Sequence, residues 1–239
     1  TATATSGMGD IAIAIGNGAN ATTSGGIFDF AFADGANSTA GILLGNGDLA
    51  SAVGDNSNVS ILLGSGDLAS AVGDNSSASA GLGNGDLASA AGSGSVAKAD
   101  GFLDSAFANG ANSNAAAGEG ILDSASANGA NSIAQALGSL DTATVSGANA
   151  EAQAVDGIGD LASVVNTGSA FDQAVAGGTS ATALGNLDIA TIIGTGSTAF
   201  AGSDLTTAGN FDLAAVFGDM LTATATGGNG LVDILPMLF

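Results

Sequence analysis

The sequence of 239 residues contains no His, Cys, Trp or Tyr, and Lys98 is its only basic side chain. Carboxylates are therefore nearly the only titratable groups available. General acid–base catalysis and nucleophilic catalysis draw mostly on His, Cys, Lys and Tyr or on a convergent carboxylate cluster. We therefore expect a protein that is not an enzyme.

Positive charge is almost absent, because one basic side chain stands against 22 acidic ones and the formal net charge is −21. Binding to a nucleic-acid backbone requires many Lys or Arg contacts, so nucleic acid is excluded as a partner. No apolar run approaches the roughly 20 residues of a membrane-spanning helix, so we expect no direct membrane span. Hydrophobic residues still make up 46% of the chain, which favours a folded protein over a disordered one.

Cysteine is absent and Pro236 is the single proline, whereas glycine occurs 40 times. Regular glycine without proline indicates regularly placed turns. A fold that needs no disulfides fits a secreted bacterial repeat protein better than a small disulfide-stapled domain. Because the chain starts at Thr1 without Met, as a mature chain does, we expect a secreted or cell-surface bacterial location.

A degenerate repeat of about 19 residues runs through the chain, marked by an Asp that is followed two residues later by Ala. The Asp residues are Asp10, Asp29, Asp48, Asp67, Asp86, Asp104, Asp123, Asp141, Asp160, Asp188 and Asp212. The steps between them are 18 or 19 residues, except for two steps of 28 and 24 that indicate insertions near residues 174–183 and 203–209. Such a period predicts stacked repeats.

Each repeat contains two short segments of period-two alternation, each closed by glycine, which is a signal for strands and turns. The first segment follows the Asp; examples of the second are residues 95–99 and 132–136. The sequence therefore predicts an all-β fold, a parallel β-solenoid or β-roll of about eleven coils with two short strands per coil. This repeat domain spans residues 1–230.

The alternation also predicts which side chains are buried. In the second strand Ser79, Lys98 and Gln135 alternate with alanines, and because an unpaired Lys is rarely buried, the alanines face a thin Ala-rich core. In the first strand the same alternation turns a stripe of large apolar side chains outward, which predicts a homo-oligomer interface. The stripe consists of Ile11, Ile13, Phe30, Phe32, Leu49, Val53, Leu68, Val72, Leu87, Leu161, Val165, Ile189, Ile193, Leu213 and Phe217. The alternative is the opposite orientation, with these residues filling the core of one chain.

Polar residues replace this stripe in the central coils, where Ser105, Ser124 and Thr142 follow the Asp. The predicted interface is polar or absent there.

The Asp column is a candidate calcium site, because stacked carboxylates repel one another and Ca²⁺ prefers carboxylate and carbonyl ligands. The candidate ligands are Asp29, Asp48, Asp67, Asp86, Asp104, Asp123, Asp141 and Asp160. In half-coil length and Gly/Asp content the repeat resembles the calcium-binding nonapeptide of RTX β-rolls, although Asp here follows Gly directly, as in Gly47-Asp48. The alternative needs no cofactor: each Asp caps turn N–H groups while solvated.

Two further features have competing interpretations. Threonine runs at residues 1–5 and 222–226 are similar to the arrays of ice-binding solenoids, but they do not recur on every coil. The apolar tail from Leu231 to Phe239 predicts either a cap on the last coil or a docking segment for a cell-surface partner.

The segments at residues 95–99 and 132–138 resemble the Ser-x-Ala-x-Gly repeats in the heads of trimeric autotransporter adhesins. That resemblance implies a parallel β-roll that trimerises laterally at a cell surface. The strings Gly-Asn-Gly-Asp-Leu-Ala-Ser-Ala and Gly-Asp-Asn-Ser are also similar to Gly/Ala-rich secreted repeat proteins of mycobacteria. The leading hypothesis is therefore an extracellular structural or adhesive solenoid, and the competing hypothesis is a calcium-binding module.

Overall fold

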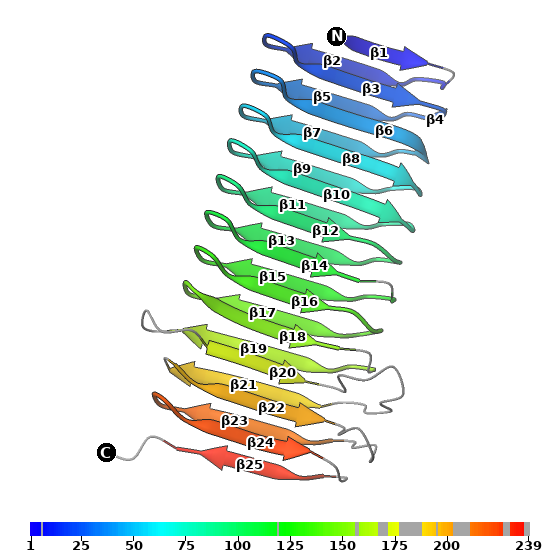
Figure 1. The fold of residues 1–239 in the computed structure, drawn as a ribbon. Coiled ribbons are helices and arrows are strands. Elements are labelled where there is room, and N and C mark those ends of the chain that lie inside the picture. The colour runs from blue at the N-terminus through cyan, green and yellow to red at the C-terminus, as the bar shows by residue number, and fades with distance from the viewer. Residues whose placement is uncertain are drawn as a thin grey trace. The chain divides into compact units, whose positions relative to one another are not determined.

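The computed structural model is an all-β chain, and every element in its described part is a strand. The structure describes residues 1–5, 7–118, 120–155, 158–166, 172–176, 188–194, 196–202, 211–226 and 230–236. The chain divides into two compact units, unit 1 (Thr1–Ala117) and unit 2 (Gly118–Phe239), which are described separately. Each unit is a parallel β-solenoid, as predicted (Figure 1).

Every coil of unit 1 contributes one strand to each of two sheets. We call the sheet whose strands follow the repeat Asp the Asp-side sheet, and the other the Ser-side sheet. The Asp-side strands are β2 (Ile11–Ile15), β5 (Phe30–Asp34), β7 (Leu49–Val53), β9 (Leu68–Val72), β11 (Leu87–Ala91) and β13 (Ser105–Asn109). The Ser-side strands are β1 (Ala2–Thr5), β3 (Asn20–Ser24), β6 (Thr39–Asn46), β8 (Asn58–Leu63), β10 (Ser77–Leu82), β12 (Val96–Ala99) and β14 (Asn114–Ala117); the short β4 (Gly26–Ile27) pairs with the end of β6.

Unit 2 has the same two sheets. Its Asp-side strands are β15 (Ser124–Asn128), β17 (Thr142–Ser146), β19 (Leu161–Asn166), β21 (Ile189–Gly194), β23 (Leu213–Phe217) and β25 (Val232–Leu235). Its Ser-side strands are β16 (Ile133–Ala136), β18 (Ala150–Ala154), β20 (Asp172–Ala176), β22 (Thr198–Gly202) and β24 (Thr222–Thr226). Strand β25 belongs to the apolar tail and pairs with β23, while residues 237–239 lie outside the described part.

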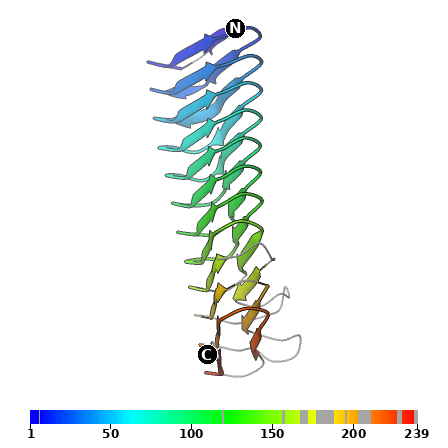
Figure 2. The ribbon, with the colours of Figure 1, turned by 90° about the vertical axis from the view of Figure 1, so that its left-hand side faces the viewer.

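The pairing is parallel and in register because one coil equals one repeat. Leu49 pairs with Leu68, and Leu68 with Leu87, so equivalent side chains form columns along the sheet. Figure 2 shows the stacked strands within each unit. The long steps of the repeat fall in unit 2, where residues 177–187 and 203–210 lie outside the described part. The predicted insertions are therefore described only at their margins.

The core between the two sheets is thin and rich in alanine, as predicted. Ala50 and Ala52 on the Asp-side strand β7 are fully buried, and Ala78 and Ala80 on the Ser-side strand β10 have at most 1% of their surface exposed. Larger core residues are few and lie at defined positions, such as Ile42 and Ile61 in unit 1. In unit 2, Val145, Val164, Ile192 and Val216 form a column in place of the second alanine. In the described part of the chain, no helix is long and apolar enough to cross a membrane.

Candidate functional site

The Asp column lies in the turn that leads into each Asp-side strand. The residue before the Asp has a positive φ, as at Gly47 (φ 73°) and Gly66 (φ 74°), where glycine carries no steric penalty. The glycine three residues before the Asp has a different role. A Cβ at Gly45 would lie 1.6 Å from Oδ2 of Asp48, so the carboxylate occupies the space that a side chain would fill. A glycine stands three residues before all eleven repeat Asp residues, and this spacing was the signal that the sequence analysis missed.

Each Asp carboxylate is bonded to the backbone of the next coil. In unit 1 the N–H of Asp67 donates to Oδ1 of Asp48 at 3.0 Å, and the N–H of Asp86 donates to Oδ1 of Asp67 at 3.0 Å. Unit 2 repeats the pattern, with the N–H of Asp160 donating to Oδ1 of Asp141 at 2.9 Å and the N–H of Asp188 donating to Oδ1 of Asp160 at 3.0 Å. The column is therefore a continuous ladder inside each unit.

The ladder is buried, which corrects the expectation of solvated carboxylates. From Asp29 to Asp212 every repeat Asp has at most 1% of its surface exposed. A charged side chain such as Asp is usually exposed to solvent. Here the turn directs the side chain inward, where the backbone N–H of the next repeat Asp donates a hydrogen bond to it. The capping role was predicted; the burial was not.

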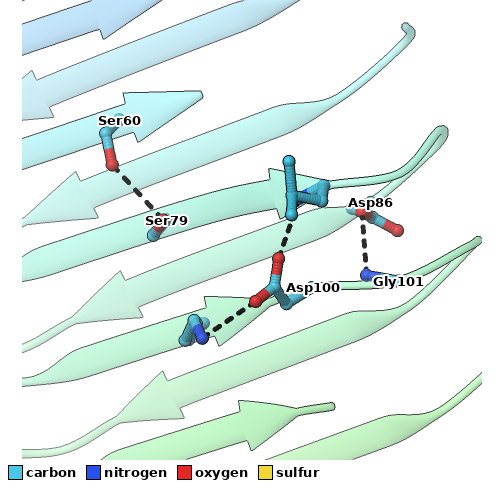
Figure 3. A network of polar contacts seen from close by, with 7 residues as sticks. Ser60, Ser79, Asp86, Asp100 and Gly101 are labelled. Atoms are coloured by element: carbon cyan, nitrogen blue, oxygen red, sulfur yellow. Dashed lines mark hydrogen bonds and ion pairs between the residues drawn. The ribbon is translucent and has the colours of Figure 1, made fainter. Parts of the chain in front are cut away.

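The second carboxylate oxygen has far fewer partners than the first. The buried Oδ2 atoms of Asp29, Asp48 and Asp67 accept no hydrogen bond of normal geometry. At Asp86 the backbone N–H of Gly101 reaches Oδ2 at a long 3.4 Å (Figure 3). At Asp141 the N–H of Gly138 donates to Oδ2 at 2.9 Å.

Burial raises the pKa of seven ladder carboxyls. Removal from water is the largest cause, the N–H bond from the next Asp opposes it, and neighbouring Asp residues add to it. Together these raise the pKa of Asp67, Asp123 and Asp188 to about 6 and that of Asp160 to about 7. Asp29, Asp86 and Asp212 shift in the same direction. The ladder thus holds its protons more tightly than exposed carboxyls do.

The surface carboxylate Asp100 behaves in the opposite way. Partial burial acts to raise its pKa, but the N–H of Leu82 at 2.8 Å and Lys98 at 2.9 Å outweigh burial and lower it (Figure 3). The only basic side chain of the protein therefore pairs with a carboxylate that is not part of the ladder.

The described part of the ladder contains no cluster of acidic side chains. Among the described residues, no three acidic side chains lie close enough together to hold an ion. Oδ1 of Asp29, Asp48 and Asp67 already accepts a backbone N–H, and Oδ2 of each of these residues lies where a Cβ of the glycine three residues earlier would be. Calcium binding by Asp29, Asp48, Asp67, Asp86, Asp104, Asp123, Asp141 and Asp160 remains a prediction, and the structure favours backbone bonding over it.

A second buried column lies in the opposite turn and was missed from the sequence. Ser38, Ser57, Ser76, Ser95, Ser113 and Ser132 are buried, and each donates its hydroxyl to the carbonyl of the glycine three residues earlier, at 2.7–3.1 Å. The recurring Gly-x-x-Ser spacing was the available signal. In this turn a Cβ at Gly54 would lie 2.8 Å from the backbone of Gly73 in the next coil, so the glycines permit the coils to stack.

The structure places the predicted interface residues on the outside of the Asp-side sheets. In unit 1 these are Ile11, Ile13, Phe30, Phe32, Leu49, Val53, Leu68, Val72 and Leu87; in unit 2 they are Leu161, Val165, Ile189, Ile193, Leu213 and Phe217. All are exposed or half-exposed, and the exposed fraction reaches 51% at Ile11 and 48% at Val72. The alternative in which these side chains fill the core of one chain does not hold, because alanines occupy the core.

Further exposed apolar side chains lie where the sequence analysis did not expect them. At the end of the Ser-side strands of unit 1, Leu44, Leu63 and Leu82 form an exposed column. A hollow of about 200 Å³ lies nearby, lined by Thr22, Ser24, Gly41, Ile42, Leu43, Ser60, Ile61 and Leu62. The lack of a side chain at Gly41 opens it.

Large residues also take the positive-φ position of the Asp turn. Phe28 (φ 62°) is 71% exposed, and Leu103, Leu122 and Leu140 have similar φ values and are about half exposed. A left-handed conformation costs such residues about 1–2 kcal/mol. The Leu103 side chain lies over Gly85 of the preceding coil, within 2.6 Å of where a Cβ there would be.

Comparison with protein families, with curated proteins and with solved structures finds no match for this chain.

Proposed function

We propose that this protein is a non-catalytic structural solenoid that self-associates through the outer face of its Asp-side sheet. The observation that carries the proposal is the set of exposed apolar columns on that face. A role in an extracellular fibre, coat or adhesive head on a bacterial surface is part of the proposal. The disulfide-free repeat sequence and the resemblance to adhesin heads support that location.

The columns are continuous because the strands are in register. In unit 1, Ile11, Phe30, Leu49, Leu68 and Leu87 follow one another along one line of the sheet. A serine column, Ser51, Ser70 and Ser89, runs beside it. The face is thus a flat surface of methyl and hydroxyl groups, and such surfaces pack well against another sheet.

The face is almost uncharged, which favours a second copy as its partner. In the outward positions of the unit 1 Asp-side strands, Asp34 is the only charged residue. Two molecules with a formal charge of −21 repel one another wherever carboxylates meet, so they can approach closely only where carboxylates are missing. Face-to-face packing of two copies meets this condition.

The apolar face of unit 1 supplies about half of the area that one partner buries in a stable interface. Six strands about 4.8 Å apart, with five residues at about 3.3 Å each, cover on the order of 400 Å² in unit 1. That is a large contiguous patch for a monomer surface. A stable interface buries about 800 Å² per partner, so residues that flank this face must contribute the remaining area.

The absence of catalytic residue types supports the structural role. The buried carboxylates bond to backbone N–H groups, and the remaining polar residues are mostly Ser, Thr and Asn on outer faces and in turns. Self-association uses the residues that the chain has in abundance.

Sedimentation velocity tests the proposal. The wild type is expected to form oligomers at micromolar concentration, and the triple variant Leu49→Ser, Leu68→Ser, Leu87→Ser is expected to be monomeric. The matched control is Leu44→Ser, Leu63→Ser, Leu82→Ser, which removes exposed leucines from the same region of the Ser-side sheet and should leave the oligomer intact. A monomeric wild type, or equal loss of the oligomer in both triple variants, would contradict the proposal.

A further inference from the structure

The Asp ladder is not used by the proposed interface, yet it holds half of the acidic residues of the protein. Eleven of the 22 acidic side chains occupy the repeat Asp position. Those from Asp29 to Asp212 are buried, whereas Asp55 and Asp74 in the opposite turn of unit 1 are exposed. The formal charge of −21 therefore counts carboxyl groups that water does not reach.

The stacking places like charges one coil apart. Asp48 lies between Asp29 and Asp67, bonded to both through the ladder, and neighbouring strands are about 4.8 Å apart. Ionised carboxylates at this spacing in a dry environment repel strongly, and such groups share protons instead of all ionising.

No positive charge offsets the ladder. Strands β6, β7, β8, β9 and β10, which surround Asp48 and Asp67, contain no charged residue. Asp100, a carboxylate outside the ladder, acts on Asp86 by repulsion, and its own ion pair is with the exposed Lys98. The other cation in the described part, the amino group of Thr1, donates to the carbonyl of Ala19 at the other turn.

The hydrogen bonds distinguish the two oxygens of each carboxyl. Oδ1 accepts the N–H of the next coil whether or not the group carries a proton, so the ladder persists in both states. Oδ2 of Asp29 and of Asp67 is buried with no hydrogen bond of normal geometry, which is unfavourable for a charged oxygen and far less so for a protonated one.

We propose that the Asp ladder is a pH-sensitive element of the fold: interior carboxyls of the ladder take up protons in mildly acidic solution, and the solenoid loses stability as they ionise. This inference concerns the interior of each unit and is independent of self-association.

The raised pKa values agree with this geometry and determine whether the free energy of unfolding rises or falls with pH. The ordinary Asp value is 3.8, and burial raises the pKa of Asp67, Asp123 and Asp188 to about 6 and that of Asp160 to about 7. A raised pKa in the folded state means that the folded state binds protons more tightly than the unfolded chain. The resulting stability is complete below about pH 4 and is lost as the pH rises through 6 to 7.

Potentiometric titration provides a direct test because the chain has no His or Cys. Between pH 8 and pH 5 only the terminal amine and shifted carboxyls are expected to take up protons in quantity. In EDTA, to exclude metal release, the folded protein should bind about three to four more protons over this range than the same chain in urea. Folded and unfolded curves that agree within about one proton would overturn the proposal.

Paired variants test the link to stability. Asp29→Asn with Asp67→Asn keeps an oxygen acceptor for each N–H and removes two ladder charges. The matched control is Asp55→Asn with Asp74→Asn, because these exposed residues also accept backbone N–H groups from the neighbouring coil, at 2.8 and 3.0 Å. Both pairs change the net charge equally, so only burial differs.

Thermal unfolding at pH 5 and pH 8 is the readout. The wild type should melt at a higher temperature at pH 5, the ladder variant should lose part of this difference, and the control should keep it. A wild type that is equally stable at both pH values, or equal effects of the two pairs, would refute the role in stability. If the ladder variant does not fold, the titration of the wild type still decides.

Discussion

The two turns of each coil solve the same stacking problem with different chemistry. Both use glycine where the chain approaches the next coil or its own side chain, and both place a polar residue inside. In the Ser turn a neutral hydroxyl donates to a carbonyl of the same turn, as Ser57 does to Gly54 at 3.0 Å. In the Asp turn a carboxylate accepts an N–H from the next coil, as Asp48 does from Asp67 at 3.0 Å.

The two hydrogen bonds differ in what they connect: the serine bond lies within one turn, whereas the aspartate bond joins two successive coils. The hydroxyl bonds of Ser38, Ser57, Ser76, Ser95, Ser113 and Ser132 each close a single turn, and alanine replaces serine at Ala19 and Ala150, which are both buried. The Asp bonds connect successive coils, and within the eleven repeats no other residue takes the Asp position. We infer that the Ser turn shapes each coil and that the Asp turn binds the coils together, at the cost of burying ionisable groups.

The largest expected effect comes from filling the space beside a ladder carboxylate. Gly45→Ala puts a methyl group 1.6 Å from Asp48 Oδ2, which the buried turn cannot relieve without breaking the ladder bond. We expect a loss of about 2–3 kcal/mol or failure to fold. Gly47→Ala, where nothing lies within 4 Å but φ is 73°, should cost only about 1 kcal/mol. Urea unfolding gives both values, and equal costs would show that the tight space at Gly45 does not matter.

A smaller loss of stability is expected from single substitutions that compare the Asp ladder with the Ser column. At pH 5, Asp48→Ala leaves the buried N–H of Asp67 without its acceptor, which should cost about 1–3 kcal/mol. Ser57→Ala removes the hydroxyl that donates to the carbonyl of Gly54 and should cost about 1 kcal/mol or less. Ala19 and Ala150 occupy the equivalent position in two other coils. Denaturant midpoints at fixed pH compare the two variants. A serine variant that is as unstable as the aspartate variant would contradict the division of roles between the turns.

Much of the fold could be predicted because the repeat reports it directly. A 19-residue period, alanines at alternate positions and Lys98 between them were sufficient to assign two strands per coil and a thin core. The same alternation placed Leu49, Leu68 and Leu87 outside, although the opposite orientation could not be rejected from the pattern alone. Period two identifies two faces and does not say which one is covered.

The interior of the turns could not be predicted in the same way. Composition assigns Asp to solvent, and only the backbone path shows that a carboxylate fits inside because Gly45 leaves room for it. The Ser column was not predicted because serine is common in the chain, and a serine has this role only where a glycine stands three residues earlier in the turn. Leu103 and Leu122 in positive-φ turns were unexpected because sequence rules reserve such positions for Gly and Asn.

The smallest expected effect is a null result that decides between two interpretations of the Asp turn. If a bound ion neutralised the ladder, an ion at about 100 times its dissociation constant would stabilise the fold by about 2.7 kcal/mol, and EDTA would lower the melting temperature by several degrees. If protons neutralise it, EDTA changes nothing at pH 7 while acidification raises the melting temperature. We expect the second result, because Oδ1 of each ladder Asp already accepts an N–H and no three acidic side chains converge in the described residues. A lower melting temperature in EDTA that Ca²⁺ restores and Mg²⁺ does not would instead make the Asp turn a metal site, a role that the neutral Ser turn could not share.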